Sequence, residues 1–256
     1  MKTRHAMLCL VMAGLGGAAA AVAQTPAEDA RGLVQRVSDT QPTDAYQFRM
    51  TLTTPGGLER EFTLSGKDLP NDIDARYLEV TGPFNLKDTR YLFYDRNERR
   101  DDQFVYLPFM KRIVRLSDKT RREPFLASTF YVNDIIEPAI DDFTYRFVGD
   151  AVVKQRNCRL VESLPKDPEH ETYSKSIMAI DPIDLVVMRA ELFDRNDKLL
   201  KVHTIETLEK IDGFWTPRKQ VMHNVQDDET SELDTVEVQY HAPLGDEIFR
   251  EAHLGR

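Results

Sequence analysis

Hydrophobic and polar residues alternate along most of the chain after residue 45, a pattern typical of strands that turn one face away from water. The clearest case is a hairpin around the turn Pro55-Gly56-Gly57. Its apolar side chains recur with period two at Tyr46, Phe48, Met50, Leu52, Leu58, Phe62 and Leu64. The pattern predicts two antiparallel strands that share one apolar face.

Similar runs follow at 76–81, 89–94, 103–107 and 111–116, then at 144–148, 152–162 and 175–180. The C-terminal third reads as a meander with turns at 194–197 and at Asp212-Gly213. Roughly ten to twelve short antiparallel strands without helices between them predict a mainly β domain, a sandwich or a barrel. An outer-membrane barrel is disfavoured, because most runs are shorter than the roughly nine to eleven residues of lipid-crossing strands.

Helical periodicity replaces this alternation near the N-terminus. The apolar stripe has the spacing of an amphipathic helix and consists of Ala30, Leu33, Val34 and Val37. Thr25 is a candidate N-cap, Pro26 suits the first helical position, and Glu28 completes a capping box. We therefore expect one helix with a single face to bury.

The segment 117–138 has no strand pattern, yet it is apolar where turn chemistry predicts polarity. Its apolar residues are Pro124, Phe125, Leu126, Phe130, Tyr131, Val132, Ile135 and Ile136. One interpretation is a lid that covers a greasy cavity and moves aside when a ligand enters. The other is a short core helix under the sheet.

Arg60 lies in phase with Leu58, Phe62 and Leu64, on the apolar face of the first hairpin. A guanidinium in such a place needs a carboxylate, a carbonyl or the head group of a ligand. The alternative is an arginine at a strand end that extends its charged group to water.

The first residues of the chain have the features of a secretory signal peptide. Lys2 and Arg4 precede an apolar run from 6 to 22, which closes on Ala21-Val22-Ala23. Cleavage after Ala23 leaves residues 24–256 as one domain in an oxidising compartment. The remaining cysteine, Cys158, is expected to be a buried small hydrophobe, the alternative being a disulfide to another chain.

Charge is unevenly distributed along the chain. The formal net charge of −9 argues against nucleic-acid binding, which needs clustered Lys and Arg. Residues 87–122 nevertheless form a basic island with an excess of Lys and Arg over Asp and Glu. Arg112, Arg115 and Arg122 are the residues we expect to meet an acidic partner or anionic head groups. A solvated hairpin edge, protected from aggregation by its charge, is an equal alternative.

The sequence contains no recognisable catalytic or metal-binding motif. It has no G-x-S-x-G element, and nothing places a histidine beside Ser128. Across the Asp212-Gly213 turn, His203 should face Met222 while His223 points to the opposite side of the sheet. We therefore interpret the histidines as solvated or strand-surface residues and expect no metal site, and no residue stands out as a candidate for catalysis.

Three segments carry a family resemblance, namely QFVYLPFMKR at 103–112, FDRNDKLLK at 193–201 and IDGFWTP at 211–217. They resemble the outer-membrane lipoprotein-sorting (LolA-like) family of periplasmic proteins over about residues 40–256. Leu126-Ala127 stands where this family usually has a small, glycine-containing pair before Ser128. The resemblance implies an incomplete antiparallel barrel wrapped over helices, with a cavity for acyl chains and no cofactor. It also implies association with inner-membrane exporters of the resistance-nodulation-division type.

We accordingly expect a monomeric periplasmic carrier that moves a lipid or an acylated protein between membranes. The acyl cavity is predicted to be lined by Tyr46, Phe48, Met50, Leu52, Arg60, Phe62, Leu64, Leu107, Phe125, Leu126, Phe130, Tyr131 and Ile135. The main alternative is a sensor or scaffold module that binds a protein partner through its basic strand region. A hydrolase comes third.

Overall fold

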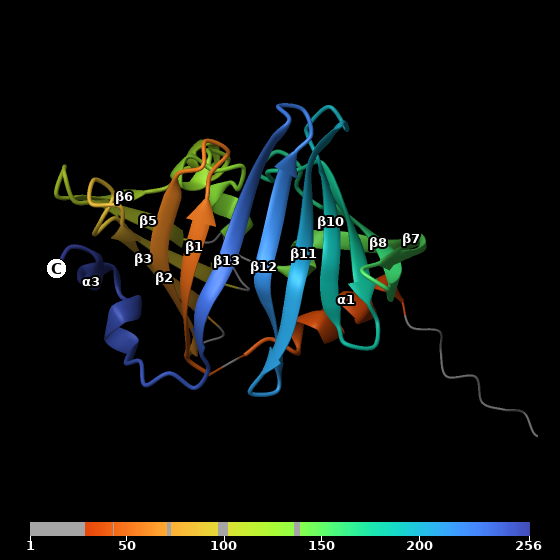
Figure 1. Cartoon of the computed structure of the whole chain (residues 1–256), viewed down its shortest axis with the longest axis horizontal. Helices are drawn as coiled ribbons and strands as arrows, with labels where there is room; N and C mark the ends of the chain where they lie inside the picture. Colours follow the sequence, from red (N-terminus) through yellow and green to blue (C-terminus); the bar gives the residue numbers. More distant parts are fainter. Residues whose placement is uncertain (1–28, 43, 71–72, 97–101, 136–138) are drawn as a thin grey trace, which may run out of the picture.

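The computed structural model describes residues 29–42, 44–70, 73–96, 102–135 and 139–256, and these build one antiparallel sheet (Figure 1). Its strands are β1 (Tyr46–Thr53), β2 (Glu59–Leu69), β3 (Ile73–Gly82), β4 (Arg90–Arg96), β5 (Asp102–Leu107), β6 (Arg112–Arg115), β7 (Phe143–Val153), β8 (Arg156–Pro165), β9 (Lys175–Asp181), β10 (Val186–Phe193), β11 (Leu199–Ile211), β12 (Phe214–Asn224) and β13 (Glu229–Gln239). The helices are α1 (Ala30–Ser38), α2 (Asp118–Arg121), η1 (Phe125–Ala127), η2 (Val132–Ile135), η3 (Ile140–Asp142), η4 (Asp246–Phe249) and α3 (Glu251–Leu254).

The sheet is open, and its strand order is β6-β5-β4-β3-β2-β1-β13-β12-β11-β10-β9-β8-β7. This confirms the predicted mainly β, incomplete barrel, with thirteen strands in the described residues rather than ten to twelve. Neighbouring strands follow one another in the chain except where β1 pairs with β13. The two edge strands, β6 and β7, are joined by residues 116–142, so this connecting segment has to cross from one edge of the sheet to the other.

The first hairpin forms as its alternation predicts, except that Leu58 lies before β2 and is 56% exposed. Met50 lies opposite Phe62, and Phe48 lies opposite Leu64, so the apolar positions share one face. The turn closes with a hydrogen bond from Gly57 N to Thr54 O at 2.8 Å. Gly57 has a φ of 73°, a left-handed conformation that glycine adopts without steric cost.

One predicted strand boundary is wrong. The turn between β7 and β8 lies at Lys154 and Gln155, both with positive φ, and not near Gly149. Gly149 instead lies at a register shift within β7. A glycine in a strand pattern is compatible with a bulge as well as with a turn, and here the bulge is what forms.

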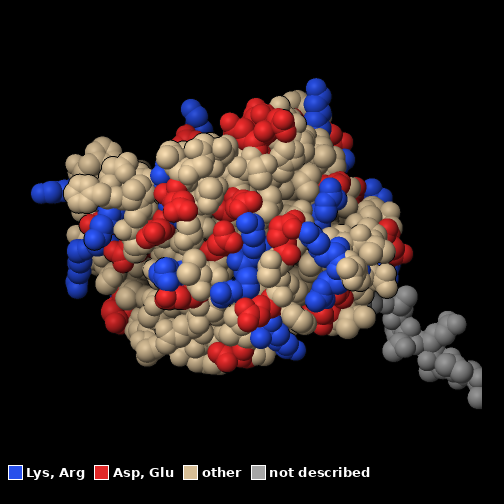
Figure 2. Space-filling model, in the orientation of Figure 1, with Lys and Arg blue, Asp and Glu red and all other residues tan. Residues whose placement is uncertain are grey.

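The outward face of the central strands is charged. On the face in view, Lys and Arg side chains are interspersed with Asp and Glu (Figure 2). Cross-strand ion pairs join Arg49 to Glu237 and Lys219 to Glu232. Because successive side chains of a strand point to opposite faces, the apolar residues of β1 and β2 are turned the other way, toward the connecting segment.

Both faces of the β3–β5 part of the sheet are covered. Leu78 and Val80 of β3 pack on one side, in a cluster that includes Phe125, Phe130 and Val132 of the connecting segment. The alternate positions pack on the other side against the C-terminal helices, in a cluster of Ala75, Tyr77, Leu92, Phe249 and Leu254.

Helix α1 begins one turn later than the predicted capping box. Its N-cap is Asp29, whose side chain accepts a hydrogen bond from Gly32 N at 2.6 Å. The predicted stripe is confirmed, since Ala30 and Leu33 are buried in a cluster with Val161 of β8 and Ile180 of β9. Thr25, Glu28 and the expected signal peptide lie outside the described residues. None of the described helices has the length and hydropathy needed to span a bilayer.

Candidate functional site

A cavity of about 450 Å³ lies where the sheet, helix α1 and the connecting segment meet. Its size is within the range of about 300–1,000 Å³ that is usual for small-molecule sites. Apolar side chains from all three parts line it, among them Val34, Val37, Met50, Phe62, Leu64, Phe130, Ile135, Met178, Val187, Leu192, Met222 and Leu233. The arrangement suits a hydrocarbon, because these side chains offer many dispersion contacts, and polar side chains such as Glu171, Tyr173 and Lys175 also reach the lining.

Five residues of the predicted cavity set line this space: Met50, Phe62, Leu64, Phe130 and Ile135. Leu52 and Phe125 are instead fully buried in the adjacent core cluster, and Phe48 and Leu126 pack against that cluster. The period-two pattern identified which side chains leave water. It did not separate those that face an open space from those that face one another.

Tyr46 and Leu107 lie away from the cavity lining in the described residues. The ring of Tyr46 covers Gly66, where an added Cβ would lie 2.2 Å from Tyr46 Cζ. Leu107 ends β5 and is paired with Arg112 of β6 in the register of the sheet.

Arg60 lies where its phase predicted, opposite Leu52 on β1. Its Nη1 donates to Glu59 O at 3.1 Å. Its Nε is buried and has no hydrogen-bond partner among the described residues. A head-group contact for Arg60 stays a prediction.

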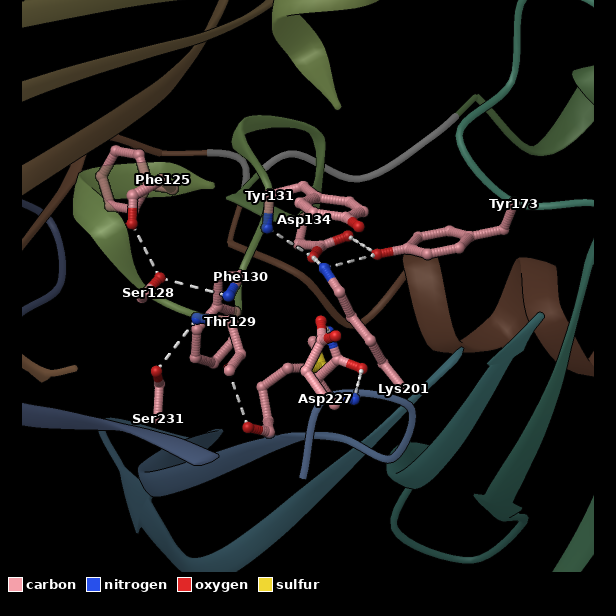
Figure 3. A network of polar contacts seen from close by, with 12 residues as sticks. Phe125, Ser128, Thr129, Phe130, Tyr131, Asp134, Tyr173, Lys201, Asp227 and Ser231 are labelled. Atoms are coloured by element: carbon pink, nitrogen blue, oxygen red, sulfur yellow. Dashed lines mark hydrogen bonds and ion pairs between the residues drawn. The ribbon is translucent and has the colours of Figure 1, made fainter. Parts of the chain in front are cut away.

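Buried hydrogen bonds fix the first half of the connecting segment (Figure 3). Thr129 N donates to Ser231 Oγ at 3.0 Å, and Thr129 Oγ1 donates to Met222 O at 2.8 Å. Ser128 Oγ donates to Phe125 O at 2.7 Å and accepts from Phe130 N at 3.1 Å. Ser128 therefore closes a turn, and its hydroxyl is occupied within the segment that bears it.

The same turn places two residues other than glycine in the left-handed region. Leu126 and Ala127 both have positive φ, of 50° and 63°. The left-handed region costs a residue with a Cβ about 1 kcal/mol or more, and glycine adopts it freely. The predicted short helical lid is thus a set of tight turns, with Ile136 outside the described residues.

An ion pair fixes the second half of the segment. Lys201 of β11 has no exposed side-chain surface, and its Nζ lies 3.3 Å from Asp134 Oδ2 in η2. Asp134 also accepts from Tyr131 N at 2.8 Å and from the Tyr173 hydroxyl at 2.7 Å. The Lys201 ammonium stands 2.9 Å from the centroid of the Tyr131 ring, a cation–π contact. Burial lowers the pKa of Lys201 to about 8, against the opposing effect of Asp134.

Sequence reasoning missed this network, although one signal pointed to it. Lys201 is two residues before His203 on the same strand, so both side chains point to the same face of the sheet. The turn geometry places His203 opposite Met222 on that face. A lysine on that face needs a partner. The partner is 67 residues away in the chain, and only the path of the connecting segment brings the two together.

The cavity wall also contains His203 and Gln220. His203 Nε2 lies 3.1 Å from Gln220 Oε1, and the Phe130 ring packs edge-on against the imidazole at 6.3 Å between centroids. The expected pairing of His203 with Met222 is confirmed. Its interpretation as a solvated residue is wrong, since burial lowers the pKa of the His203 imidazole. Among the described residues, no group of three His, Cys, Asp or Glu side chains could hold a metal ion.

The residues of the basic island do not all share one setting. Arg112 and Arg115 lie on the exposed edge strand β6. Arg122 is half-buried, and its Nη2 donates to Glu169 O at 3.1 Å. Arg99 and Arg100 lie outside the described residues.

Comparison with known proteins identifies the fold. A family model described as "Uncharacterized protein" matches residues 73–256. No curated protein matches the chain. A putative outer membrane lipoprotein-sorting protein domain from Vibrio parahaemolyticus is 22% identical, with a TM-score of 0.82, over 89% of this chain and 98% of the other.

Two further solved structures have the same architecture. A DUF1329 family protein from Desulfovibrio piger is 24% identical, with a TM-score of 0.82, over 88% of this chain and 97% of that one. A LolA superfamily protein from Nitrosomonas europaea is 19% identical, with a TM-score of 0.68, over 89% of this chain and all of the other (100%). The predicted fold is therefore confirmed.

Proposed function

The chain belongs to the family whose model, described as "Uncharacterized protein", matches residues 73–256, and it has the LolA-like fold; on that premise we propose that it is a periplasmic carrier of acyl chains. It binds a lipid or an acylated protein at one membrane, shields the hydrocarbon from water, and releases it at another. The observation that carries this proposal is the cavity of about 450 Å³ between the sheet, α1 and the connecting segment.

The energetics support such a role. Removing one methylene group from water is worth about 0.8 kcal/mol, so ten of them contribute about 8 kcal/mol. That is the scale on which a single acyl chain holds to a bilayer, and a carrier needs a comparable affinity to extract and then release it. Leu52 and Phe125 are fully buried in a core cluster, and other members of that cluster, among them Met50 and Phe62, line the cavity.

We propose a binding role rather than a catalytic one. Ser128, the serine considered as a nucleophile, uses its hydroxyl to donate to Phe125 O and to accept from Phe130 N. Its side chain is buried. A hydroxyl held in this way has no base that could activate it.

A second candidate function is a sensor or scaffold that binds a protein partner. It is favoured by the tip of the β5–β6 hairpin, where Phe109 is 81% exposed and Met110 is 44% exposed beside the basic Arg112. An inner-membrane exporter of the resistance-nodulation-division type stays a prediction, and Arg112 and Arg115 are the residues through which we expect such contact.

The test is to purify the chain from periplasm under native conditions and measure its mass before and after lipid extraction. We expect a mass excess that extraction removes and that mass spectrometry assigns to acylated molecules. Ala190 lines the cavity, so the larger ring of Ala190→Phe should occupy the ligand space and abolish the mass excess. Val152→Phe adds the same ring at a position that is 70% exposed and should leave it unchanged. A ligand-free mass, with no binding of an added fluorescent fatty acid, would reject the carrier function.

A further inference from the structure

The wall of the apolar cavity contains a pair of polar side chains that the hydrocarbon itself does not need. His203 on β11 and Gln220 on β12 lie on adjacent strands, with His203 opposite Met222 and Gln220 opposite Ile205. Both line the cavity. His203 Nε2 and Gln220 Oε1 lie 3.1 Å apart. Within the described residues, this is the one side-chain hydrogen bond that either residue makes.

The imidazole is neutral near pH 7, because burial lowers its pKa from the ordinary value. A neutral imidazole has one donor and one acceptor, and a primary amide has both as well. When His203 Nε2 donates to Gln220 Oε1, the ring keeps a free acceptor at Nδ1 and the amide keeps its free NH₂ donor. When the amide and the ring adopt the reverse arrangement, the ring keeps a free donor and the amide a free acceptor.

Either arrangement leaves at least one free donor and one free acceptor in the wall of a cavity that is otherwise mostly apolar. Buried polar groups are normally hydrogen-bonded, since leaving one unpaired costs about 1–3 kcal/mol. Lys201, a buried cation of the same region, shows the usual solution, because Asp134, Tyr173 and Tyr131 surround it. The His203–Gln220 pair lacks such protein partners, so its remaining groups are directed to whatever fills the cavity.

We propose that His203 and Gln220 form a recognition site for a neutral group that both donates and accepts hydrogen bonds, a hydroxyl or an amide, on the ligand's hydrocarbon chain. This rests on the carrier function proposed above and specifies its ligand class. An ester or an ether offers acceptors alone and would leave one protein group unpaired. A carboxylate would bring a charge to a site where the histidine is neutral, and it has no donor to offer.

The surroundings make such a site selective. Phe130 of the connecting segment packs edge-on against the imidazole, and both His203 and Gln220 are half-buried in the cavity wall. Hydrogen bonds are stronger in a low-dielectric environment, and an unmade one is more costly there. Sites built to hydrogen-bond a ligand group therefore reject analogues that lack it far better than apolar pockets discriminate by size.

The experiment uses the whole chain, purified from periplasm and delipidated, with the uncharged hydrophobic dye N-phenyl-1-naphthylamine as the reporter. Four competitors with the same hydrocarbon displace it at pH 7: 1-dodecanol, dodecanamide, methyl dodecanoate and dodecyl methyl ether. We expect dodecanol or dodecanamide to compete about tenfold more strongly than the ester and the ether, which is the effect of about 1.4 kcal/mol. Comparing dodecanol with dodecanamide shows whether the site prefers a hydroxyl or an amide.

His203→Leu and Gln220→Leu should each bring this ratio close to one, while the affinity for the ether stays the same or rises. Val187→Ala is the matched control, since it removes apolar contact from the same cavity and should weaken all four competitors alike. The His203 ring ¹⁵N resonances of the unmodified chain give a measurement that needs no variant to fold, and they should shift with dodecanol but not with the ether.

Equal competition by all four compounds in the unmodified chain would overturn the recognition site while leaving the carrier function intact, and would indicate that water satisfies the pair. A ratio that survives both leucine substitutions would overturn the assignment to His203 and Gln220. Absence of any reporter binding would reject the carrier function itself, and the recognition site with it.

Discussion

Lys201 and Asp134 form a buried ion pair that joins strand β11 to the connecting segment, with Nζ and Oδ2 3.3 Å apart. The lysine side chain has 0% exposure and the aspartate side chain 8%. The pair fixes the middle of the connecting segment, five residues after Thr129, which bonds to Met222 and Ser231. The position of the segment over the cavity therefore depends on a few specific polar contacts as well as on apolar packing.

Breaking this pair from the acidic side should be strongly destabilising. Asp134→Ala leaves the Lys201 ammonium buried without a counter-ion, so we expect the free energy of unfolding to fall by about 3 kcal/mol or more. Urea denaturation followed by circular dichroism measures it. The double variant with Lys201→Met should recover a large part of the loss, because the uncompensated charge is gone.

The matched control is the ion pair of Lys154 with Glu206, whose side chains are well exposed. Lys154→Met should change the free energy of unfolding by no more than about 1 kcal/mol. An effect of Asp134→Ala as small as this would show that the buried pair does not hold the segment.

Stability should rise with pH in a window set by Lys201. The pKa of this lysine is about 8 in the folded chain and near 10.5 when it is solvated. Between these values the unfolded chain binds more protons at this group than the folded chain does, so the free energy of unfolding increases as pH rises. Denaturation curves at pH 8, 9 and 10 should show this increase in the unmodified chain. A rise of the same size in Lys201→Met would assign it to another group.

His203 should give a second window, at lower pH, in which stability also rises with pH. Burial lowers the pKa of its imidazole below the ordinary value of 6.5, so the unfolded chain takes up a proton there before the folded chain does. The free energy of unfolding therefore falls as pH decreases through 6.5. We expect this loss to be smaller in His203→Asn, and the ring to titrate below pH 6.5 when followed by NMR. Titration at or above 6.5 would contradict the burial of this histidine.

Gly66 should be intolerant of a methyl group. A Cβ at this position would lie 2.2 Å from Tyr46 Cζ, so Gly66→Ala has to displace the tyrosine ring. We expect a loss of roughly 1–3 kcal/mol in the free energy of unfolding, and partial recovery when Tyr46→Ala is combined with it. Gly56→Ala is the control, because nothing lies within 4 Å of its added Cβ. Equal tolerance at both positions would contradict the close approach of Tyr46.

Charge reversal on β6 should separate the two candidate functions. Arg112→Glu with Arg115→Glu changes an exposed edge strand that does not line the cavity. For the carrier, we expect binding of a fluorescent fatty acid to stay unchanged while transfer from donor membranes slows. Loss of fatty-acid binding in this variant would contradict the position of the site. If the unmodified chain captures a protein partner and this variant does not, the sensor or scaffold function is favoured.

The sequence by itself determined the local structure of this protein. Period-two alternation located the strands, and the stripe from Ala30 to Val37 located α1. The turn at Asp212-Gly213 was enough to pair His203 with Met222. These features depend on residues close together in the chain, whose side-chain directions follow from the regular geometry of strands and helices.

The tertiary structure alone decided the pairing of β1 with β13, the path of residues 116–142 and the composition of the cavity. Alternation predicted that Leu52 and Leu64 both leave water, yet one is buried in the filled core and the other lines open space. The ion pair of Lys201 with Asp134 likewise joins distant segments of the chain. So does the packing of Phe130 against His203. Hydrophobic patterning reports which side chains avoid solvent. What they meet instead depends on how the whole sheet curves around the segment that crosses it.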